Sequence, residues 1–197
     1  MDKFGDPGFV HHQQISQMWG LAALRLATSE IVGFNATNYA NKLKEYLCLL
    51  RSVAFEQTGD DVDMVKKHIN FNVLEDAIES VEKYAKRLDK KANELRRNPK
   101  RQICYMSLFC INGTRNAEIR KVNKAYLEFE RMFIGNGLPG RPFYKHVIYA
   151  PGTWTGYEGF TFPSIREAIQ DHRWEEAGYE VYEIAKLIKH GSSHGKF

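Results

Sequence analysis

Histidines are the side chains of this 197-residue chain best suited to binding a metal ion or moving a proton, but their spacing fits neither task. His11 and His12 are neighbours, and neighbouring side chains on a helix point about 100° apart, so the pair cannot chelate one ion. The other five have no cysteine or carboxylate at ligand spacing: His68, His146, His172, His190 and His194. We therefore expect no metal site in this chain, and only a helix-start role or plain exposure for His11 and His12.

Motifs for nucleophilic or phosphate chemistry are also missing from the sequence. It contains no P-loop, no GxGxxG after a strand and no GxSxG. Cys104 and Cys110 could pair across a short loop, but three cysteines are too few for a disulfide framework. We expect no catalytic residue in this chain and no cofactor bound to it.

Two triplets match the glycosylation motif, at Asn35 and at Asn112. Asn35 has another explanation, because it stands where it can cap a helix. Asn112 is expected in a loop and is the better glycosylation candidate if the protein is exported.

The composition indicates one soluble domain, with 43% hydrophobic residues and a net charge of +4. No apolar run approaches the roughly 20 residues that span a bilayer, and three of the first ten residues are charged, where a signal peptide would have an apolar run. Nine Lys and Arg lie between Lys83 and Arg101, which suggests an anionic partner. The preferred interpretation is the solvated face of an amphipathic helix, so we expect neither nucleic-acid binding nor membrane contact.

Helical periodicity organises most of the chain. Apolar residues repeat at helical spacing in six segments, which we expect to be helices: about 12–30, 36–57, 73–97, 115–134, 164–171 and 174–189. Asn72, with Glu75 three residues later, resembles a capping box at the start of the third helix. Four long helices with short or irregular connections, followed by a C-terminal helix, predict an all-α, up-down four-helix bundle forming one domain over residues 1–197.

Two connections stand out from this helical pattern. The run RQICYMSLFCING, between the third and fourth helices, is apolar and could be a strand-like flap, a membrane-dipping loop or a buried plug. A plug packed on the bundle is the preferred interpretation. Residues 135–163 are rich in glycine, proline and aromatic residues, which predicts a long ordered loop, with a possible short extended stretch over 144–149.

Within this loop, GLPGRPFYKHVIYAPG and the following Gly156-Tyr157 and Phe162-Pro163 resemble the helical domain shared by glutamate carboxypeptidase II and the transferrin receptor. The similarity is closer to the carboxypeptidase branch and its fungal members. It extends to FGDPGFVHHQQISQMWGLAALRLA, EIVGFNATNYANKL and RKVNKAYLEFERMFI, whereas the region around RQICYMSLFC looks like an insertion. Loop residues that the resemblance marks as scaffold are Arg141, Pro142, Phe143, His146 and Pro151.

The resemblance implies a homodimerisation domain that follows a zinc peptidase domain, whose last zinc ligand lies just upstream of the segment matching residues 1–4. The partners it implies are a second copy of the chain and that upstream peptidase domain, which would hold the zinc. In the longer enzymes, a loop matching residues 152–162 completes the substrate pocket with a Lys-Tyr pair. Here the matching positions are Gly156 and Tyr157, so the tyrosine is kept and the lysine is not.

The resemblance also leaves an alternative open, because some fungal members are not active peptidases. The domain would then be a non-enzymatic interaction or sorting module of a transferrin-receptor-like protein. In either case the longer protein is expected to be membrane-anchored, with this domain on the lumenal, vacuolar or extracellular side. Surplus apolar residues off the main helical stripes are candidates for the dimer contact: Leu21, Leu24, Leu127 and Met132.

Overall fold

A computed structural model describes residues 3–58, 62–97, 112–153 and 159–194 of the chain. These residues form two compact units, which divide between Phe34 and Asn35. The chain is mostly helical, as the periodicity predicts, and it also has one small hairpin of two strands. Within the described ranges, no helix is long and apolar enough to cross a membrane.

The first unit consists of the 3-10 turn η1 (Pro7–Phe9) and the helix α1 (Val10–Thr28). Asp6 starts α1, because its carboxylate accepts the backbone N–H groups of His11 and His12 at 3.1 and 2.9 Å. The ring Nδ1 of His12 lies 2.5 Å from the same carboxylate. This hydrogen bond, together with the backbone bonds, holds the pKa of Asp6 below its usual value. The helix-start role expected of the two histidines is therefore confirmed.

No residue of α1 is buried, although its apolar stripe is the one that the periodicity predicts. Ile15, Trp19 and Leu26 lie on one face of the helix, and Leu21 and Leu24 lie close to the opposite face, since successive residues are about 100° apart. All five are exposed. A helix that is apolar on both faces is typical of one that is covered on all sides in its working state.

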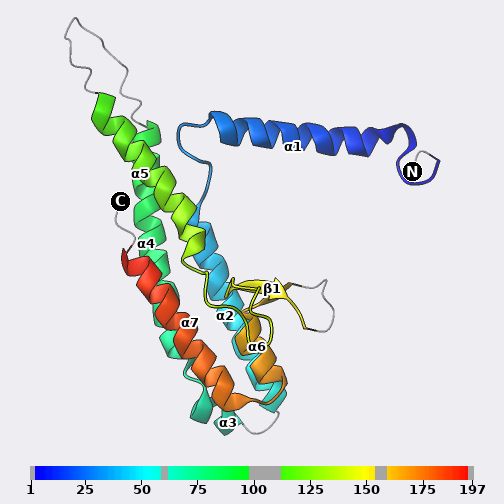
Figure 1. Cartoon of the computed structure of the whole chain (residues 1–197), viewed down its shortest axis with the longest axis vertical. Helices are drawn as coiled ribbons and strands as arrows, with labels where there is room; N and C mark the ends of the chain where they lie inside the picture. Colours follow the sequence, from blue (N-terminus) through cyan, green and yellow to red (C-terminus); the bar gives the residue numbers. More distant parts are fainter. Residues whose placement is uncertain (1–2, 59–61, 98–111, 154–158, 195–197) are drawn as a thin grey trace, which may run out of the picture. The chain divides into compact units, whose positions relative to one another are not determined.

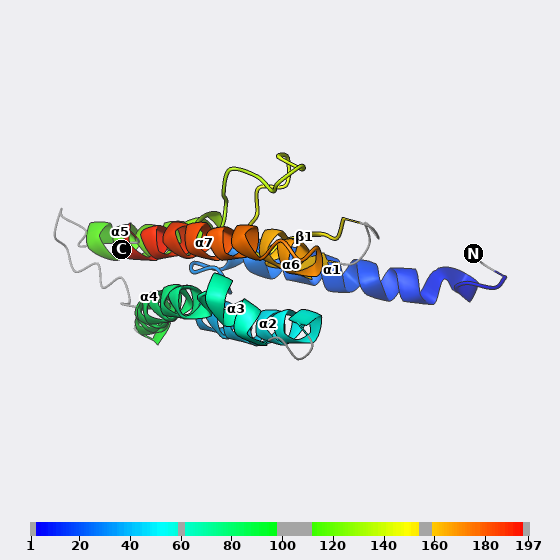
Figure 2. The same ribbon diagram turned by 90° about the horizontal axis from the view of Figure 1, so that it is seen from below.

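The second unit is built from six helices and the hairpin: α2 (Ala36–Thr58), α3 (Val62–His68), α4 (Phe71–Arg97), α5 (Asn112–Arg131), β1 (Tyr149–Pro151), β2 (Gly159–Thr161), α6 (Pro163–Gln170) and α7 (Trp174–His194). Figure 2 shows these helices in two layers, with α5, α6 and α7 over α2, α3 and α4. The main packing partners are α4 with α7 and α2 with α4.

The core of this unit comes from the stripes that the sequence marks. In α2 the buried side chains are Ala36, Ala40, Leu43, Leu47, Leu50 and Ala54. In α4 they extend from Phe71 to Leu95 at helical spacing. Most charged residues of α4 are exposed, and some pair with one another, as Lys86 does with Glu82 at 2.8 Å. The part of the basic run that lies in α4, from Lys83 to Arg97, is thus largely a solvated helix face, as expected.

Several boundaries differ from the sequence prediction. Asn70, not Asn72, caps α4, since its side-chain oxygen accepts the N–H of Asn72 at 3.2 Å. Glu75 does not complete a capping box and instead pairs with Arg51. The short helix α3 was not predicted, and the extended stretch lies at 149–151 and 159–161 rather than at 144–149. The RQICYMSLFC run, with Cys104 and Cys110, lies outside the described residues.

One carboxylate joins three helices of this unit. Asp89, in the middle of α4, accepts the backbone N–H groups of Ala36 and Thr37 at the start of α2, at 3.1 and 2.8 Å. It also accepts the Thr37 hydroxyl at 2.5 Å and the Tyr126 hydroxyl of α5 at 2.8 Å. Burial, and then the nearby Asp89 carboxylate, raise the pKa of Tyr126 above its usual range.

Candidate functional site

The candidate site lies where the loop after α5 meets the β1–β2 hairpin and α6. Backbone hydrogen bonds close residues 135–148, which we call the aromatic loop, into an ordered structure. The Gly135 N–H donates to the Lys145 carbonyl at 2.8 Å, and the Leu138 N–H donates to the Tyr144 carbonyl at 3.0 Å. Gly137 has a φ of 113°, and a Cβ there would lie 2.4 Å from the Pro142 carbonyl oxygen. The loop therefore requires glycine at this position.

Arg141 fixes this loop to the hairpin and to α6. Its guanidinium donates to the Pro151 carbonyl at 2.6 Å and pairs with the Glu167 carboxylate. It also lies over the Tyr144 ring, 5.5 Å from the ring centre. A planar guanidinium with several donors can hold such a three-way junction, which a lysine cannot do. The expected scaffold residues Arg141 and Pro151 therefore touch each other.

His146 holds the other end of the loop. Its Nδ1 accepts the backbone N–H groups of Ile148 and Tyr149, both at 3.2 Å, so the ring proton is on Nε2. Nε2 lies 3.0 Å from the Glu130 carboxylate of α5, which also accepts the Tyr39 hydroxyl. Burial, followed by the Glu130 charge, raises the pKa of Tyr39 above its usual range. This network anchors the base of β1 to two helices.

The far end of the hairpin is also fixed, by the backbone of Phe162. This residue has a φ of 49°, in the left-handed region, which is unfavourable for a residue with a side chain. Its ring is fully buried, and its N–H donates to the Ile148 carbonyl at 3.0 Å. Strained backbone of this kind persists where the surroundings over-determine it, and it clusters at functional sites.

A cleft of about 660 Å³ opens between these segments. Its walls are Gln57, Pro139, Gly140, Arg141, Thr153, Phe160, Glu167, Gln170, Asp171 and Arg173. The two arginines of these walls already have acidic partners: Arg141 pairs with Glu167, and Arg173 pairs with Asp171 and Glu176. The cleft is thus polar but internally neutralised, and an anionic ligand would have to displace one of these pairs.

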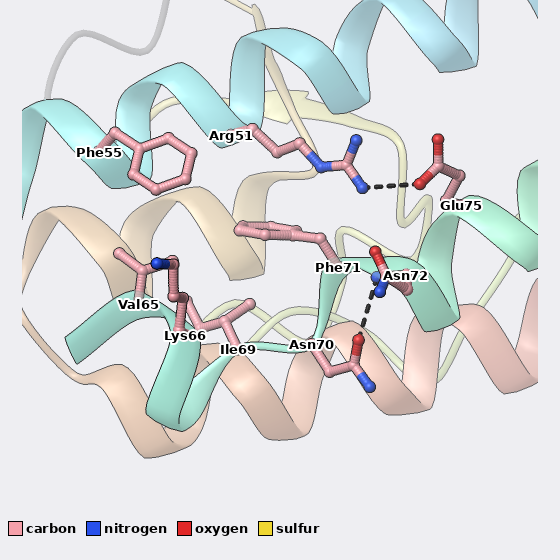
Figure 3. Close-up of a pocket in the computed structure, with 9 residues that line it drawn as sticks. All are labelled: Arg51, Phe55, Val65, Lys66, Ile69, Asn70, Phe71, Asn72 and Glu75. Atoms are coloured by element: carbon pink, nitrogen blue, oxygen red, sulfur yellow. Dashed lines mark hydrogen bonds and ion pairs between the residues drawn. The ribbon is translucent and has the colours of Figure 1, made fainter. Parts of the chain in front are cut away.

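A second cavity, of about 560 Å³, lies among α2, α3 and α4. Figure 3 shows Arg51 above the Phe71 ring and bonded to Glu75, with Phe55, Val65 and Ile69 completing an apolar wall. Its guanidinium is 5.9 Å from the ring centre. The ion pair with Glu75 neutralises the Arg51 guanidinium, and the other polar residues that line this cavity are Lys66, Asn70 and Asn72.

Among the described residues, no group of three or more His, Cys, Asp or Glu is placed to hold a metal ion. The structure does bring His68 and His172 to one shallow cavity, which the spacing did not predict. Met64 and Trp174 also line that cavity.

Other predicted site residues are distributed as follows. Gly156 and Tyr157 lie outside the described residues. Pro142 and Phe143 are exposed at the tip of the aromatic loop. Leu21, Leu24 and Leu127 are exposed, while Met132 is half-buried close to Gly191 of α7.

The two glycosylation candidates are both at helix starts. Asn35 caps α2, with its side-chain oxygen accepting the Asn38 N–H at 2.8 Å. The capping role expected of Asn35 is therefore confirmed. Asn112 is the first residue of α5 and does not lie in a loop as predicted.

Three acidic residues that hold elements together were missed from the sequence: Asp89, which joins α4 to α2 and α5, and Glu130 and Glu167 at this site. Each is an acidic residue on an amphipathic helix, where the pattern predicts a solvated side chain. Glu130 bonds to His146, 16 residues away along the chain, and to Tyr39, 91 residues away. Glu167 bonds to Arg141, 26 residues away. The nearest signal in the sequence was Arg141, in a stretch of loop, residues 135–148, that contains no Asp or Glu to pair with it.

Comparison with known proteins gives a consistent result. The family model described as transferrin receptor-like dimerisation domain matches residues 69–194. A protein of Arthroderma benhamiae named as a probable glutamate carboxypeptidase is 32% identical over 174 residues, covering 86% of this chain and 20% of that protein. An Arabidopsis thaliana protein with the same description is 31% identical over 202 residues, covering 98% of this chain and 25% of that protein.

A third relative carries a different description. An inactive zinc metalloprotease of Schizosaccharomyces pombe is 24% identical over 198 residues, covering 100% of this chain and 23% of that protein. The chain spans about a fifth to a quarter of the length of these relatives.

Proposed function

Because the chain belongs to the transferrin receptor-like dimerisation domain family, we propose that it is the homodimerisation domain of a glutamate carboxypeptidase-like zinc metallopeptidase. The domain is non-catalytic by itself, and the zinc is held by the peptidase domain of the longer enzyme. The match of the family model to residues 69–194 carries this proposal.

The dimer contact is an isologous one, in which the same apolar face of each copy meets its symmetry mate. Leu127 supports this role, because it is 60% exposed on α5 inside the matched region. Leu21, Leu24 and Met132 are the other candidates. A stable contact of this kind commonly buries more than about 2,000 Å² in total, so several of these residues act together.

The upstream peptidase domain is the second partner. The helix α1 supports this role, since it is apolar on both faces and none of its residues is buried. It also lies outside residues 69–194. A surface of a neighbouring domain that packs on such a helix would bury both of its apolar faces.

The loop over 152–162 completes the substrate pocket of the peptidase domain, with Tyr157 and Gly156 at the positions of the substrate-holding pair. Glycine in place of lysine removes a charge-assisted contact to a substrate carboxylate, typically worth about 1.5 to 3 kcal/mol. We therefore propose a carboxypeptidase-like enzyme whose preference for a terminal glutamate is weak. Changing Tyr157 to Ala in the longer enzyme would alter substrate affinity; unchanged kinetics would remove the pocket role.

Light scattering after size-exclusion chromatography tests the dimer. We expect the full 197-residue chain to have a mass of about twice 22.8 kDa over a tenfold dilution. Leu127→Glu should shift the mass toward the monomer. Leu49→Glu is the matched control, because Leu49 is 57% exposed on α2 but lies outside the matched region. A monomeric mass for the unaltered chain would contradict the proposal.

A second function is favoured by one specific comparison. The Schizosaccharomyces pombe relative is described as an inactive zinc metalloprotease, and Gly156 removes the substrate-holding cation here. The alternative is therefore a non-enzymatic interaction or sorting module. The sequence upstream distinguishes the two, since intact His, Asp and Glu zinc ligands support an enzyme and their loss supports the module.

A further inference from the structure

The two ring nitrogens of His146, at the base of the hairpin, have opposite roles. Nδ1 faces the backbone N–H groups of Ile148 and Tyr149, both at 3.2 Å. Because a backbone N–H can only donate, Nδ1 must carry a lone pair and no proton. The ring proton is on Nε2, which lies 3.0 Å from the Glu130 carboxylate of α5. His146 therefore joins β1 to α5 only while its ring is neutral.

The two N–H groups belong to residues that hold the base of the hairpin in place. Ile148 is fully buried, and its carbonyl accepts the Phe162 N–H at 3.0 Å. Tyr149 is the first residue of β1 and pairs with Thr161 of β2. Phe162 has the unfavourable φ of 49°, which persists only while its surroundings hold it. Through Ile148, the bonds to His146 thus support a strained part of the backbone.

Protonation would change one side of this ring and leave the other intact. The second proton would sit on Nδ1, where it would turn the acceptor of two N–H groups into a donor that faces them. The Nε2 contact would be kept, because the Glu130 carboxylate attracts an imidazolium more strongly than a neutral imidazole. The His146 side chain is 20% exposed, so a proton from solvent can reach it.

The other groups around the ring leave this titration to His146. Glu130 is the charged side chain bonded to the ring in the described part of the chain, and it also accepts the Tyr39 hydroxyl of α2 at 3.2 Å. The Tyr149 ring stacks on the imidazole, 5.3 Å between centres, and the Phe133 ring of α5 lies at 6.0 Å. Burial raises the pKa of Tyr39 and of Tyr149 above the usual range, so both hydroxyls stay neutral. Lys145, the preceding residue, is exposed.

We propose that His146 makes the base of the hairpin sensitive to pH in the range where histidine titrates. With the ring neutral, β1 is bonded to His146 and through it to α5. With the ring protonated, His146 keeps Glu130 and releases β1, so that Ile148, Phe162 and the start of α6 loosen together. This opening takes up a proton and is therefore favoured as the pH falls. The inference goes beyond the proposed dimer and does not depend on it.

Amide hydrogen exchange of the full 197-residue chain, followed by NMR at single residues, tests this proposal. Protection factors correct for the intrinsic pH dependence of exchange. Those of Ile148 and Tyr149 should fall about three- to tenfold on going from about pH 7.5 to about pH 5.5, because one proton is linked to the opening. Ile69, whose N–H donates to the Val65 carbonyl at 2.8 Å, is the reference amide and should change by less than about twofold.

Three variants identify the group that titrates. His146→Asn should keep both amides protected at both pH values, because an asparagine oxygen accepts nearby backbone N–H groups in the same way but does not titrate. Glu130→Gln should move the fall to lower pH, since it removes the charge that attracts the imidazolium. His172→Asn is the matched control: His172 is exposed, and asparagine tolerates its φ of 56°, so the fall should remain unchanged.

Equal protection of the two amides at both pH values in the unaltered chain would overturn the proposal. A fall that persists in His146→Asn would overturn it as well, because the titrating group would then be another one. The NMR signals of the ring nitrogens give a check that needs no variant. At neutral pH, Nδ1 should show the signal of an unprotonated nitrogen and Nε2 that of a protonated one, and the reverse tautomer would contradict the proposal.

Discussion

Asp89 shows how a single side chain can organise this fold. A carboxylate at the start of a helix offsets N–H groups that have no partner within the helix, and usually it comes from the helix itself. Here α2 receives that carboxylate from α4, 52 residues away from Thr37. The Tyr126 hydroxyl brings α5 to the same carboxylate.

Removing this carboxylate should destabilise the second unit. We expect Asp89→Ala to lower the free energy of unfolding by about 2 to 4 kcal/mol, since it removes the acceptor of the Ala36 and Thr37 N–H groups at the start of α2 and one acceptor of the Tyr126 hydroxyl. Urea unfolding followed by circular dichroism measures the change. Asp76→Ala, on the exposed face of the same helix, should stay within about 0.5 kcal/mol.

A double-mutant cycle with Tyr126→Phe checks the physical reason. In the Asp89→Ala background, removing the hydroxyl should cost less than in the unaltered chain, because its partner is already gone. If the two losses of unfolding free energy were strictly additive, the two residues would act independently, and the Asp89–Tyr126 hydrogen bond would not contribute to stability.

At the scale of elements, the helices were predictable because helical periodicity is a local property. The starts of α2, α4 and α5 lie zero to three residues from the predicted positions, and each apolar stripe of α2 and α4 is buried as expected. The seven-residue α3 was missed because it is too short to show periodicity. The strands were missed because their pairing, Tyr149 with Thr161, joins residues on either side of a loop.

The candidate site was predictable only in part. Glycine, proline and aromatic content marked residues 135–163 as an ordered loop, and the family resemblance marked Arg141 as part of its scaffold. What holds the loop could not be read from the sequence, because Glu130 and Glu167 look like any solvated helix residue. The exposure of α1 was also unpredictable, since a periodic stripe shows that a helix has an apolar face but not what covers it.

The close approach of α7 to the end of α3 gives an element-scale prediction. Gly178 lies so near that a Cβ there would be 2.1 Å from the His68 carbonyl oxygen, a backbone atom that cannot turn aside. Gly178→Ala should therefore push α7 outward and lower the free energy of unfolding by about 1 to 3 kcal/mol, despite the better helix propensity of alanine.

Chemical denaturation of this variant, beside Gly20→Ala, measures that effect. A Cβ at Gly20 of α1 meets nothing within 4 Å, so this control should be neutral or slightly stabilising. Equal changes in unfolding free energy for the two variants would mean that a Cβ at Gly178 does not clash with the His68 carbonyl.

At the scale of the whole molecule, we expect apolar side chains of the two compact units to contribute very differently to the free energy of unfolding. Trp19 is 74% exposed, whereas Leu74 is fully buried. Trp19→Ala should change the free energy of unfolding of the chain by no more than about 0.5 kcal/mol, and Leu74→Ala should lower it by about 2 to 5 kcal/mol. Guanidinium unfolding measures both. A large loss with Trp19→Ala would mean that α1 is covered within the chain itself.

The Arg141 junction has a consequence for the order in which the molecule assembles. Its bonds close chain segments of only ten residues, to Pro151, and 26 residues, to Glu167. Loop-closure entropy grows with segment length, so these contacts form with less loss of chain freedom than the α2–α4 contacts at Asp89. The aromatic loop, the hairpin and α6 therefore make a local folding unit, which can reach its final geometry without waiting for the long-range helix pairing.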